Sequence, residues 1–416
     1  MIIELLTSVG IPELAAKFIF AGAVGFLAIN FIAVYAGVVS VIERKVAAKM
    51  QSRVGPNRVG PGGWLQWLAD GIKLMLKEDI HPHGADHFLF NMAPFLIVCG
   101  VAGAFAVLPW GPAHAIAADL NVGILYFISI TSLVVVGILM AGWSSNNKWA
   151  LIGGMRAAAQ IVSYEIPVAM GLLPAIMIVG SLQVSALTES QGFMPWDWTA
   201  FDNPFALLGF LVFLTGSVAE SNRAPFDLPE AESELVAGFF TEYSGFRFAC
   251  FTLGEFAATW AIGAITTAVY LGGGQLPPSM AGMIPLSIGL FVLKTMSVVF
   301  LLMWFRWTLP RFRIDQMMDF SWKYLLPLSL VAFFGQAIYI LISWDSPAMQ
   351  TIVSHLLALA VLGVIFLFAG RVAYNIKIQL IPINTLSTEI GPLERAGKIA
   401  PPPAVVEEVE TAEEGA

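Results

Sequence analysis

Long apolar runs recur along the whole sequence and constrain its fold more than any other feature. A bilayer core of about 30 Å requires about 20 apolar residues in a helix, and each of these runs has about that length. A transmembrane barrel would instead show short segments of alternating polarity. The pattern therefore predicts an all-α, polytopic membrane protein. The expected spans are residues 17–42, 90–109, 121–142, 161–183, 204–221, 248–271, 285–305, 323–343 and 351–373.

Basic residues are distributed unevenly among the loops. Lys and Arg follow the first, third, fifth, seventh and ninth runs, whereas the loops after the even-numbered runs contain neither. Because Lys and Arg accumulate in cytoplasmic loops, this pattern predicts an N-terminus outside the membrane and a C-terminus inside if the ninth run spans. The first run is not expected to be a cleaved signal, since its bases follow the apolar stretch.

The sequence divides into a membrane domain and a polar tail. We expect a membrane domain over residues 1–345, an additional transmembrane helix over 346–375 and a cytoplasmic tail over 376–416. The formal net charge is −8, and half of it falls in residues 391–416. Such a segment cannot bury enough apolar surface to fold, which predicts disorder; a docking segment is the alternative.

The content of cysteine and histidine limits the redox chemistry. The two cysteines, Cys99 and Cys250, lie in separate runs, and an iron–sulfur cluster needs about four thiolates. His81, His83 and His87 could hold a metal, although a plain interfacial loop explains them as well. We therefore expect no redox centre within this chain.

The loop between the first two runs contains a predicted interfacial helix. Gly- and Pro-rich turns at residues 55–63 precede the sequence WLQWLADGIKLMLKED at 64–79. Its apolar residues recur at helical spacing, with charged residues on the other faces and two tryptophans at its start. An amphipathic helix of this kind lies along the membrane surface. It could be a surface anchor or the wall of a cavity that opens at the membrane.

Charged residues next to and within the apolar runs point to a functional site. The segment 220–242 carries one base, Arg223, and six acids: Glu220, Asp227, Glu230, Glu232, Glu234 and Glu242. Glu165, Glu255 and Lys294 lie inside other runs. A charge at the bilayer centre costs about 2.5–3.5 kcal/mol, so these groups need partners, altered protonation or internal water. Structural ion pairs are one explanation, and an internal proton or ion path is the one that we favour.

Several motifs resemble one membrane-protein family. They are ERK at 43–45, QSRVGPNRVGPGG at 51–63, LADGIKLMLKED at 68–79, EIP at 165–167, AESNRAPFDLPEAESELVAGF at 219–239, TEYSG at 241–245 and RWTLPRFRIDQMM at 306–318. Together they resemble the quinone-proximal membrane subunit of respiratory complex I, which is the H subunit of bacterial NADH:quinone oxidoreductase. The similarity extends from about residue 15 to residue 345.

The resemblance implies a role for particular residues. Arg44, Asp70 and Arg306 would lie along a chamber for ubiquinone, which is the substrate. The residues that would link quinone reduction to proton translocation are Glu165, Glu220, Glu230, Glu232, Glu234, Glu242, Glu255 and Lys294. Glu43, Arg223 and Asp227 would have structural or pairing roles.

The resemblance also implies partners and a location. FMN and iron–sulfur clusters would reside only in partner subunits. Those partners would be the peripheral-arm quinone-site and terminal iron–sulfur subunits, small membrane subunits and antiporter-like subunits, with membrane lipid around them and no nucleic acid. The implied location is the bacterial inner membrane.

Two alternatives remain at this stage. A related hydrogenase complex contains a homologous membrane subunit, but the intact GPNRVGP and RWTLPRFRIDQ segments favour the quinone enzyme. A free-standing ion transporter would be expected to show internal repeats, and we find no repeat in the sequence. The ninth run departs from the usual eight spans of the family, and its partner is unknown.

Overall fold

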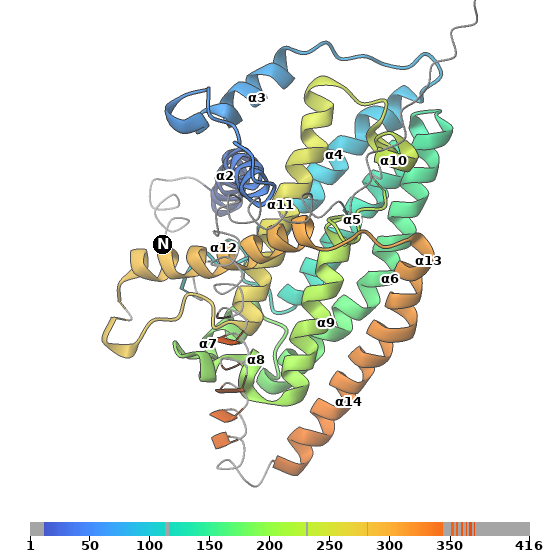
Figure 1. The fold of residues 1–416 in the computed structure, drawn as a ribbon. Helices are drawn as coiled ribbons and strands as arrows, with labels where there is room; N and C mark the ends of the chain where they lie inside the picture. The colour runs from blue at the N-terminus through green and yellow to red at the C-terminus, as the bar shows by residue number, and fades with distance from the viewer. Residues whose placement is uncertain are drawn as a thin grey trace, which may run out of the picture. The chain divides into compact units, whose positions relative to one another are not determined.

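Helices form the framework of the computed structural model, which describes residues 12–112, 116–229, 232–280, 282–343 and scattered positions between 351 and 370. In that part of the chain the only strand-like feature is an isolated bridge between Pro109 and Ile116. The long helices (Figure 1) are α2 (Glu13–Met50), α4 (His87–Ala104), α5 (Gly123–Ser144), α6 (Lys148–Val179), α9 (Pro204–Glu220), α11 (Gly245–Tyr270), α12 (Ile284–Thr308) and α14 (Leu326–Ser343).

Short helices connect the long ones. One of them, α13, is followed by a π-helical segment, Phe320–Leu325, that leads directly into α14. The others lie in loops. The short elements are α3 (Gln66–Leu76), α7 (Val184–Glu189), α8 (Thr199–Asp202), α10 (Glu232–Leu235), α13 (Ile314–Asp319) and the 3₁₀ turns Pro61–Gly63, Pro195–Asp197, Gly238–Phe240 and Pro278–Met280.

The predicted class, an all-α polytopic membrane protein, is confirmed. Seven helical segments of the described chain are long and apolar enough to cross a membrane, and α9 is a shorter apolar helix of 17 residues. The predicted boundary near residue 345 and most of the predicted ninth span, 351–373, lie outside the described residues. The tail at 376–416 lies outside them as well.

Two helices extend well beyond the predicted spans. α6 begins at Lys148 rather than near residue 161, because the Asn147 side chain accepts a hydrogen bond from the Trp149 amide and caps the helix there. α2 likewise continues to Met50, past the end of the predicted span at residue 42, and includes basic residues that follow the apolar run. As a result, Glu165 lies near the middle of α6 and not one turn from its start.

Close helix packing in the bundle depends on glycine. α6 crosses α9 at Gly171 and Gly209, where an added Cβ would lie within 3.0 Å of backbone atoms of the other helix. Small residues allow membrane helices to approach closely when lipid supplies no hydrophobic driving force. The crossing brings α6, which carries Glu165, against α9, which ends at Glu220.

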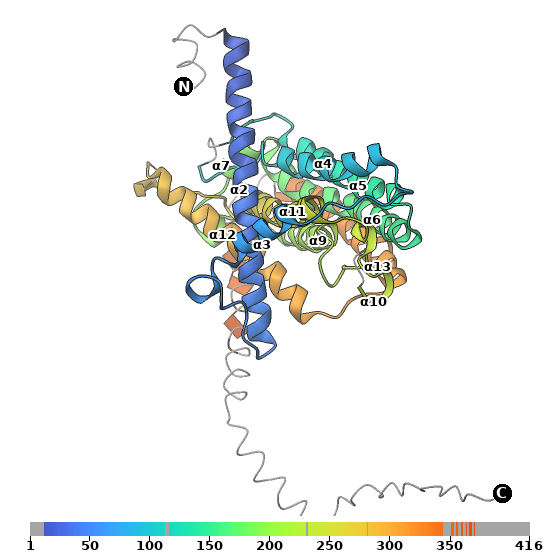
Figure 2. The same cartoon turned by 90° about the horizontal axis from the view of Figure 1, so that it is seen from above.

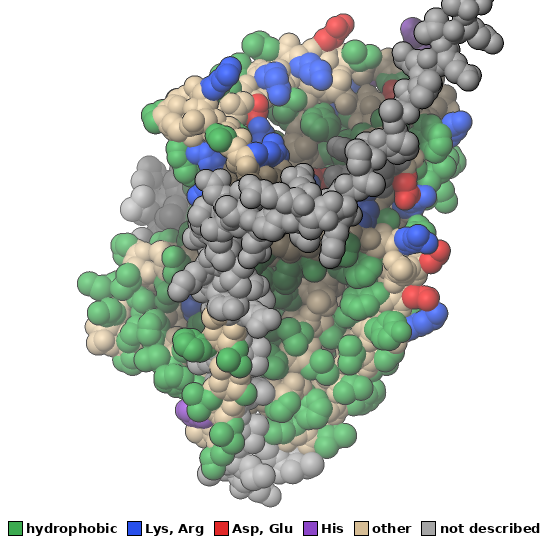
Figure 3. Space-filling view, in the orientation of Figure 1, with side chains coloured by type: hydrophobic (Ala, Val, Ile, Leu, Met, Phe, Trp, Pro, Cys, Tyr) green, Lys and Arg blue, Asp and Glu red, His purple; other side chains and the backbone are tan. Residues whose placement is uncertain are grey.

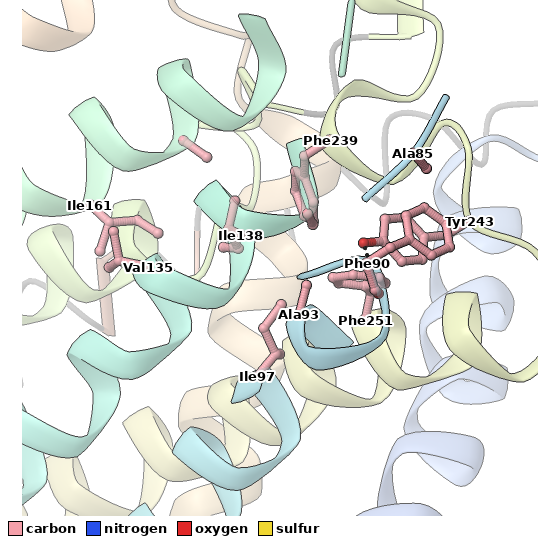
Figure 4. Packing of buried hydrophobic residues seen from close by; sticks show 12 residues of the cluster. Ala85, Phe90, Ala93, Ile97, Val135, Ile138, Ile161, Phe239, Tyr243 and Phe251 are labelled. Atoms are coloured by element: carbon pink, nitrogen blue, oxygen red, sulfur yellow. Dashed lines mark hydrogen bonds between the residues drawn. The ribbon is translucent and has the colours of Figure 1, made fainter. Parts of the chain in front are cut away.

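An aromatic cluster fixes the end of the acidic segment to the bundle (Figure 4). The rings of Phe90 on α4 and Tyr243 stack with centroids 4.0 Å apart, and Phe251 on α11 packs edge-on against Tyr243. The Tyr243 hydroxyl also donates to the Phe90 carbonyl at 3.2 Å. Because Glu242 precedes Tyr243, this contact sets the position of that carboxylate.

The helix predicted in the first long loop is present but shorter than expected. α3 spans Gln66–Leu76, and none of its residues is buried. Figure 2 shows it crossing α2, where the Trp67 ring approaches Gly37 so closely that a Cβ there would lie 2.9 Å from it. Its apolar side chains, such as Ile72 and Met75, remain exposed.

Candidate functional site

Most of the predicted site residues gather at one end of the helix bundle. This end, called the basic end below, is formed by the loops at residues 51–86, 221–244 and 309–313. Ion pairs connect these loops to α2 and to one another. Figure 3 shows Lys and Arg side chains around a hollow beside α3.

The buried carboxylate of Glu43, near the C-terminal end of α2, connects this helix to α12 and to the loop after α9. The Glu43 side chain is 5% exposed, and its two oxygens accept from Arg306 of α12 at 2.8 Å and from Arg223 at 3.3 Å. Arg223 is equally buried and lies 5.0 Å from the Phe256 ring centroid. Two arginines, from α12 and from the loop after α9, therefore share this one carboxylate.

The adjacent residue, Arg44, connects α2 to α3. Its guanidinium lies 2.7 Å from a carboxylate oxygen of Asp70, and Lys73 lies 3.5 Å from the other oxygen. Burial alone would raise the pKa of Asp70, but the hydrogen bond from Gln66 and the charge of Arg44 outweigh it and lower the pKa. The three residues predicted to line a chamber are therefore close together. Asp70 pairs with Arg44, and Arg306 pairs with Glu43, the residue before Arg44 on α2.

The lowered pKa of Asp70 gives a testable pH dependence. A depressed folded-state pKa means that the ionised carboxylate stabilises the attachment of α3 above the unfolded pKa, and that this stabilisation is lost as the pH falls through the folded value. We expect Asp70→Asn to accelerate amide exchange in α3 up to about five-fold at pH 7, since partly exposed pairs contribute at most about 1 kcal/mol. Exchange measured by mass spectrometry checks this.

The matched control for that experiment is Asp86→Asn, in the same loop but away from α3. Exchange in α3 should be unchanged in this variant. Acidification below about pH 4 should loosen α3 in the parent protein and have little effect in Asp70→Asn. Equal acid sensitivity in both proteins would contradict the role of Asp70.

Three acids of segment 220–242 are paired with residues from other parts of the chain. Asp227 receives a hydrogen bond from Arg311 at 2.8 Å, and Glu234 receives one from Arg156 of α6 at 2.8 Å. Glu242 accepts from the Asn147 side chain at 2.6 Å. Glu230 lies outside the described residues, and for Glu232 the structure describes only the backbone, at the start of α10.

Two carboxylates lie together within the bundle. Glu165 on α6 accepts a hydrogen bond from the Ser132 hydroxyl of α5, and its charge acts on Glu220 at the end of α9. Glu220 lines a cavity of about 40 Å³ together with Thr131 and Ser217. The Ser217 hydroxyl is buried and has no hydrogen-bond partner in the described chain. Most of the cavity wall is apolar, and Glu220, Thr131 and Ser217 are its polar groups. Its volume is sufficient for a water molecule beside them.

The other two charges predicted inside the membrane are Glu255 on α11 and Lys294 on α12, and they lie beside different parts of α11. Glu255 lies one turn before Ala258, which lines the same cavity, and one of its oxygens is buried without a hydrogen-bond partner among the described residues. Lys294, in contrast, donates to the carbonyl of Leu271, beyond the opposite end of α11. The structure therefore brings Glu165 and Glu220 together, places Glu255 one turn from a residue that lines their cavity, and places Lys294 near the far end of α11.

Sequence reasoning missed the polar residues that hold these acids. Ser132 and Thr131 form a hydroxyl pair in an otherwise apolar run, which was the available signal. Gln160 is completely buried, and its amide donates to the carbonyls of Ala219 and Phe226 at 2.7 and 2.8 Å. This contact fixes the turn that follows Glu220. Nothing in the local sequence pattern marks Gln160 for that role.

The fold and these contacts define a class of protein: a polytopic membrane protein with ion-paired charges at one end and carboxylates beside a cavity between its helices. The family model described as NADH dehydrogenase matches residues 23–337. The chain belongs to this family, which confirms the resemblance seen in the motifs.

Relatives from diverse bacteria share one description, the H subunit of NADH-quinone oxidoreductase. The protein from Anaeromyxobacter dehalogenans (strain 2CP-C) is 46% identical over 84% of this chain and 89% of its own length. The protein from Chlorobaculum parvum (strain DSM 263 / NCIMB 8327) is 50% identical over 75% and 90%, respectively. The protein from Geobacillus kaustophilus (strain HTA426) is 50% identical over 70% and 84%.

Proposed function

We propose that this chain is the quinone-proximal membrane subunit of a proton-translocating NADH:quinone oxidoreductase and forms part of its ubiquinone chamber. The observation that carries the proposal is the cluster at the basic end of α2. There Glu43, Arg223 and Arg306 meet, and Arg44 meets Asp70 in the next position. Arginine remains charged at all relevant pH values and binds oxygen anions well, so these arginines suit a quinone oxygen that gains negative charge during reduction.

The acids between the helices suit the coupling of that reduction to proton movement. Glu165 and Glu220 interact electrostatically, and the cavity beside Glu220 extends towards α11. A charge that appears about 8 Å away changes the energy of such a carboxylate by about 2 kcal/mol at an effective dielectric constant of about 20. That change is sufficient to move a proton. Glu255 and the loop acids, including Glu230 and Glu232, would extend the same path.

The assembly follows from this assignment. The basic end would face the cytoplasm, with the N-terminus in the periplasm of the bacterial inner membrane. FMN and iron–sulfur clusters would be carried by the peripheral subunits that dock there, and antiporter-like subunits would continue the proton path. The names of the relatives favour this quinone enzyme over a related hydrogenase or a free-standing transporter.

The quinone assignment can be tested with Arg306→Ala in the assembled complex. Glu43 would keep Arg223 as its partner, so the fold should survive the loss of Arg306. We expect NADH-driven reduction of quinone to fall about ten-fold, which corresponds to about 1.4 kcal/mol in the transition state. Electron transfer from NADH to a hydrophilic artificial acceptor should remain close to the parent value.

Arg313→Ala is the matched control, because Arg313 is exposed in the loop that follows α12 and forms no ion pair in the described chain. It should retain both activities. If Arg306→Ala lowered both activities equally, the defect would lie in assembly and not in the quinone chamber.

A further inference from the structure

The end of α11 away from the basic end is held by side chains from several segments. An α-helix leaves its last four carbonyl groups without intrahelical donors. Here the amide of Gln191 donates to the carbonyls of Ala268 and Val269 at 2.9 and 3.0 Å. Lys294 of α12 donates to the carbonyl of Leu271, the residue that follows the helix, at 2.7 Å.

Gln191 also fixes the turn that follows α11. Its side-chain oxygen accepts from the Gly272 amide at 2.8 Å and from the Thr199 amide at 3.2 Å. Gly272 has a φ of 74°, which favours glycine, and an added Cβ there would lie 2.6 Å from the Trp198 ring. The turn, the loop at 191–199 and the helix end thus form one closely packed junction.

Lys294 brings a positive charge to this junction. Its ammonium group lies 4.5 Å from the centroid of the Trp198 ring, and it forms no ion pair within the described part of the chain. A helix C-terminus carries partial negative charge, and an aromatic face attracts cations. A positive charge strengthens both contacts, and neither requires that charge to be released.

The junction is distant from the acids of the proposed proton path. At about 1.5 Å per residue, Leu271 is roughly 24 Å along the α11 axis from Glu255. Direct proton transfer requires hydrogen-bond distance or one intervening water. Lys294 is therefore badly placed to exchange protons with Glu255, although both belong to the charges that the sequence analysis grouped together.

We propose that Lys294 is a positioning residue that, together with Gln191, anchors this end of α11 through the contacts of its amino group with the Leu271 carbonyl and the Trp198 ring. Because this end is fixed, α11 cannot slide along its axis when Glu255, in the other half of the helix, moves or changes its protonation. The inference deepens the proposed function, and its activity readout rests on that function. It differs from the expected role of Lys294 as a carrier of protons.

The experiment compares Lys294→Arg, Lys294→Met and Gln191→Met in the assembled complex in membranes. Arginine keeps the charge and the donors but does not deprotonate, whereas methionine keeps only an apolar side chain. We expect Lys294→Met to lower quinone-dependent turnover about ten-fold and the Tm of the complex by several degrees. Lys294→Arg should restore the proton-to-electron ratio and most of the turnover and Tm.

Gln191→Met tests the anchor without removing any ionisable group, and it should lower turnover and Tm in the same way as Lys294→Met. The proposal is overturned if a fully assembled Lys294→Arg complex loses proton pumping as completely as Lys294→Met. It is also overturned if Gln191→Met matches the parent in both measurements. Failure of the proposed function itself would appear differently: Tm would still respond to these variants, while no carboxylate variant would change proton pumping.

Discussion

Substitution of Glu220 with Gln is expected to abolish most proton pumping while the complex still assembles. The amide keeps the size and most hydrogen bonds of the carboxyl group but carries no transferable proton. Because Glu220 lies beside the cavity and interacts with Glu165, its loss interrupts the path proposed between α6 and α11. We expect a decrease of roughly 10²-fold, the lower end for a positioned proton-transfer group. Proton uptake and quinone reduction measured together in membranes check this.

Glu165→Gln should have a similar effect, and the double variant should be little worse than either single variant. Residues that act on one step are not additive. Glu189→Gln is the matched control, since Glu189 is exposed at the other end of the bundle. A normal proton-to-electron ratio in both Glu220→Gln and Glu165→Gln would eliminate these acids from coupling and leave a structural role.

Removal of the Glu43 carboxylate is expected to produce the largest loss of stability of any single change at the basic end. Glu43→Ala leaves Arg223 buried at 4% exposure without its ion-pair partner. The loss of one member of a buried pair costs about 3–5 kcal/mol, because the remaining charge is not solvated. Thermal unfolding of the complex, and the amount of this subunit in membranes, measure the effect.

A double variant separates the buried charge from other causes. Glu43→Ala combined with Arg223→Met should be less destabilised than the sum of the two single variants, since no buried charge of that pair remains unpaired. Asp319→Ala, which breaks an exposed pair with Lys323, should cost less than about 1 kcal/mol and serves as the control. If Glu43→Ala cost no more than Asp319→Ala, the pairing of Glu43 with Arg223 would not be important for stability.

The two sets of contacts suggest a division of labour within the molecule. The basic end carries the arginine cluster around Glu43 and Arg44, which we propose as part of the quinone chamber. The carboxylates lie deeper, between α5, α6, α9 and α11. Asp227, Glu234 and Glu242 each have a partner elsewhere in the chain, so these three hold the acidic segment against the bundle.

The sequence alone determined the class of fold and the family. Apolar length specifies transmembrane helices because a bilayer leaves the backbone almost no other way to satisfy its hydrogen bonds. The motifs at 51–63 and 219–239 were enough to indicate the family, which the match to its model and the identity to its bacterial members confirmed. The sequence also marked Glu165, Glu220 and Glu255, since charges within apolar runs are conspicuous in one dimension.

Only the tertiary structure decided which charges meet. The sequence showed six acids around one base, whereas the fold brings Arg156 and Arg311 to two of those acids from far along the chain. It also separated Lys294 from the acids with which it had been grouped. Pairing depends on helix crossings and on where a helix ends, and a hydropathy pattern contains neither. Ion pairs act over a few ångströms, so residues distant in sequence become partners only after the helices have packed.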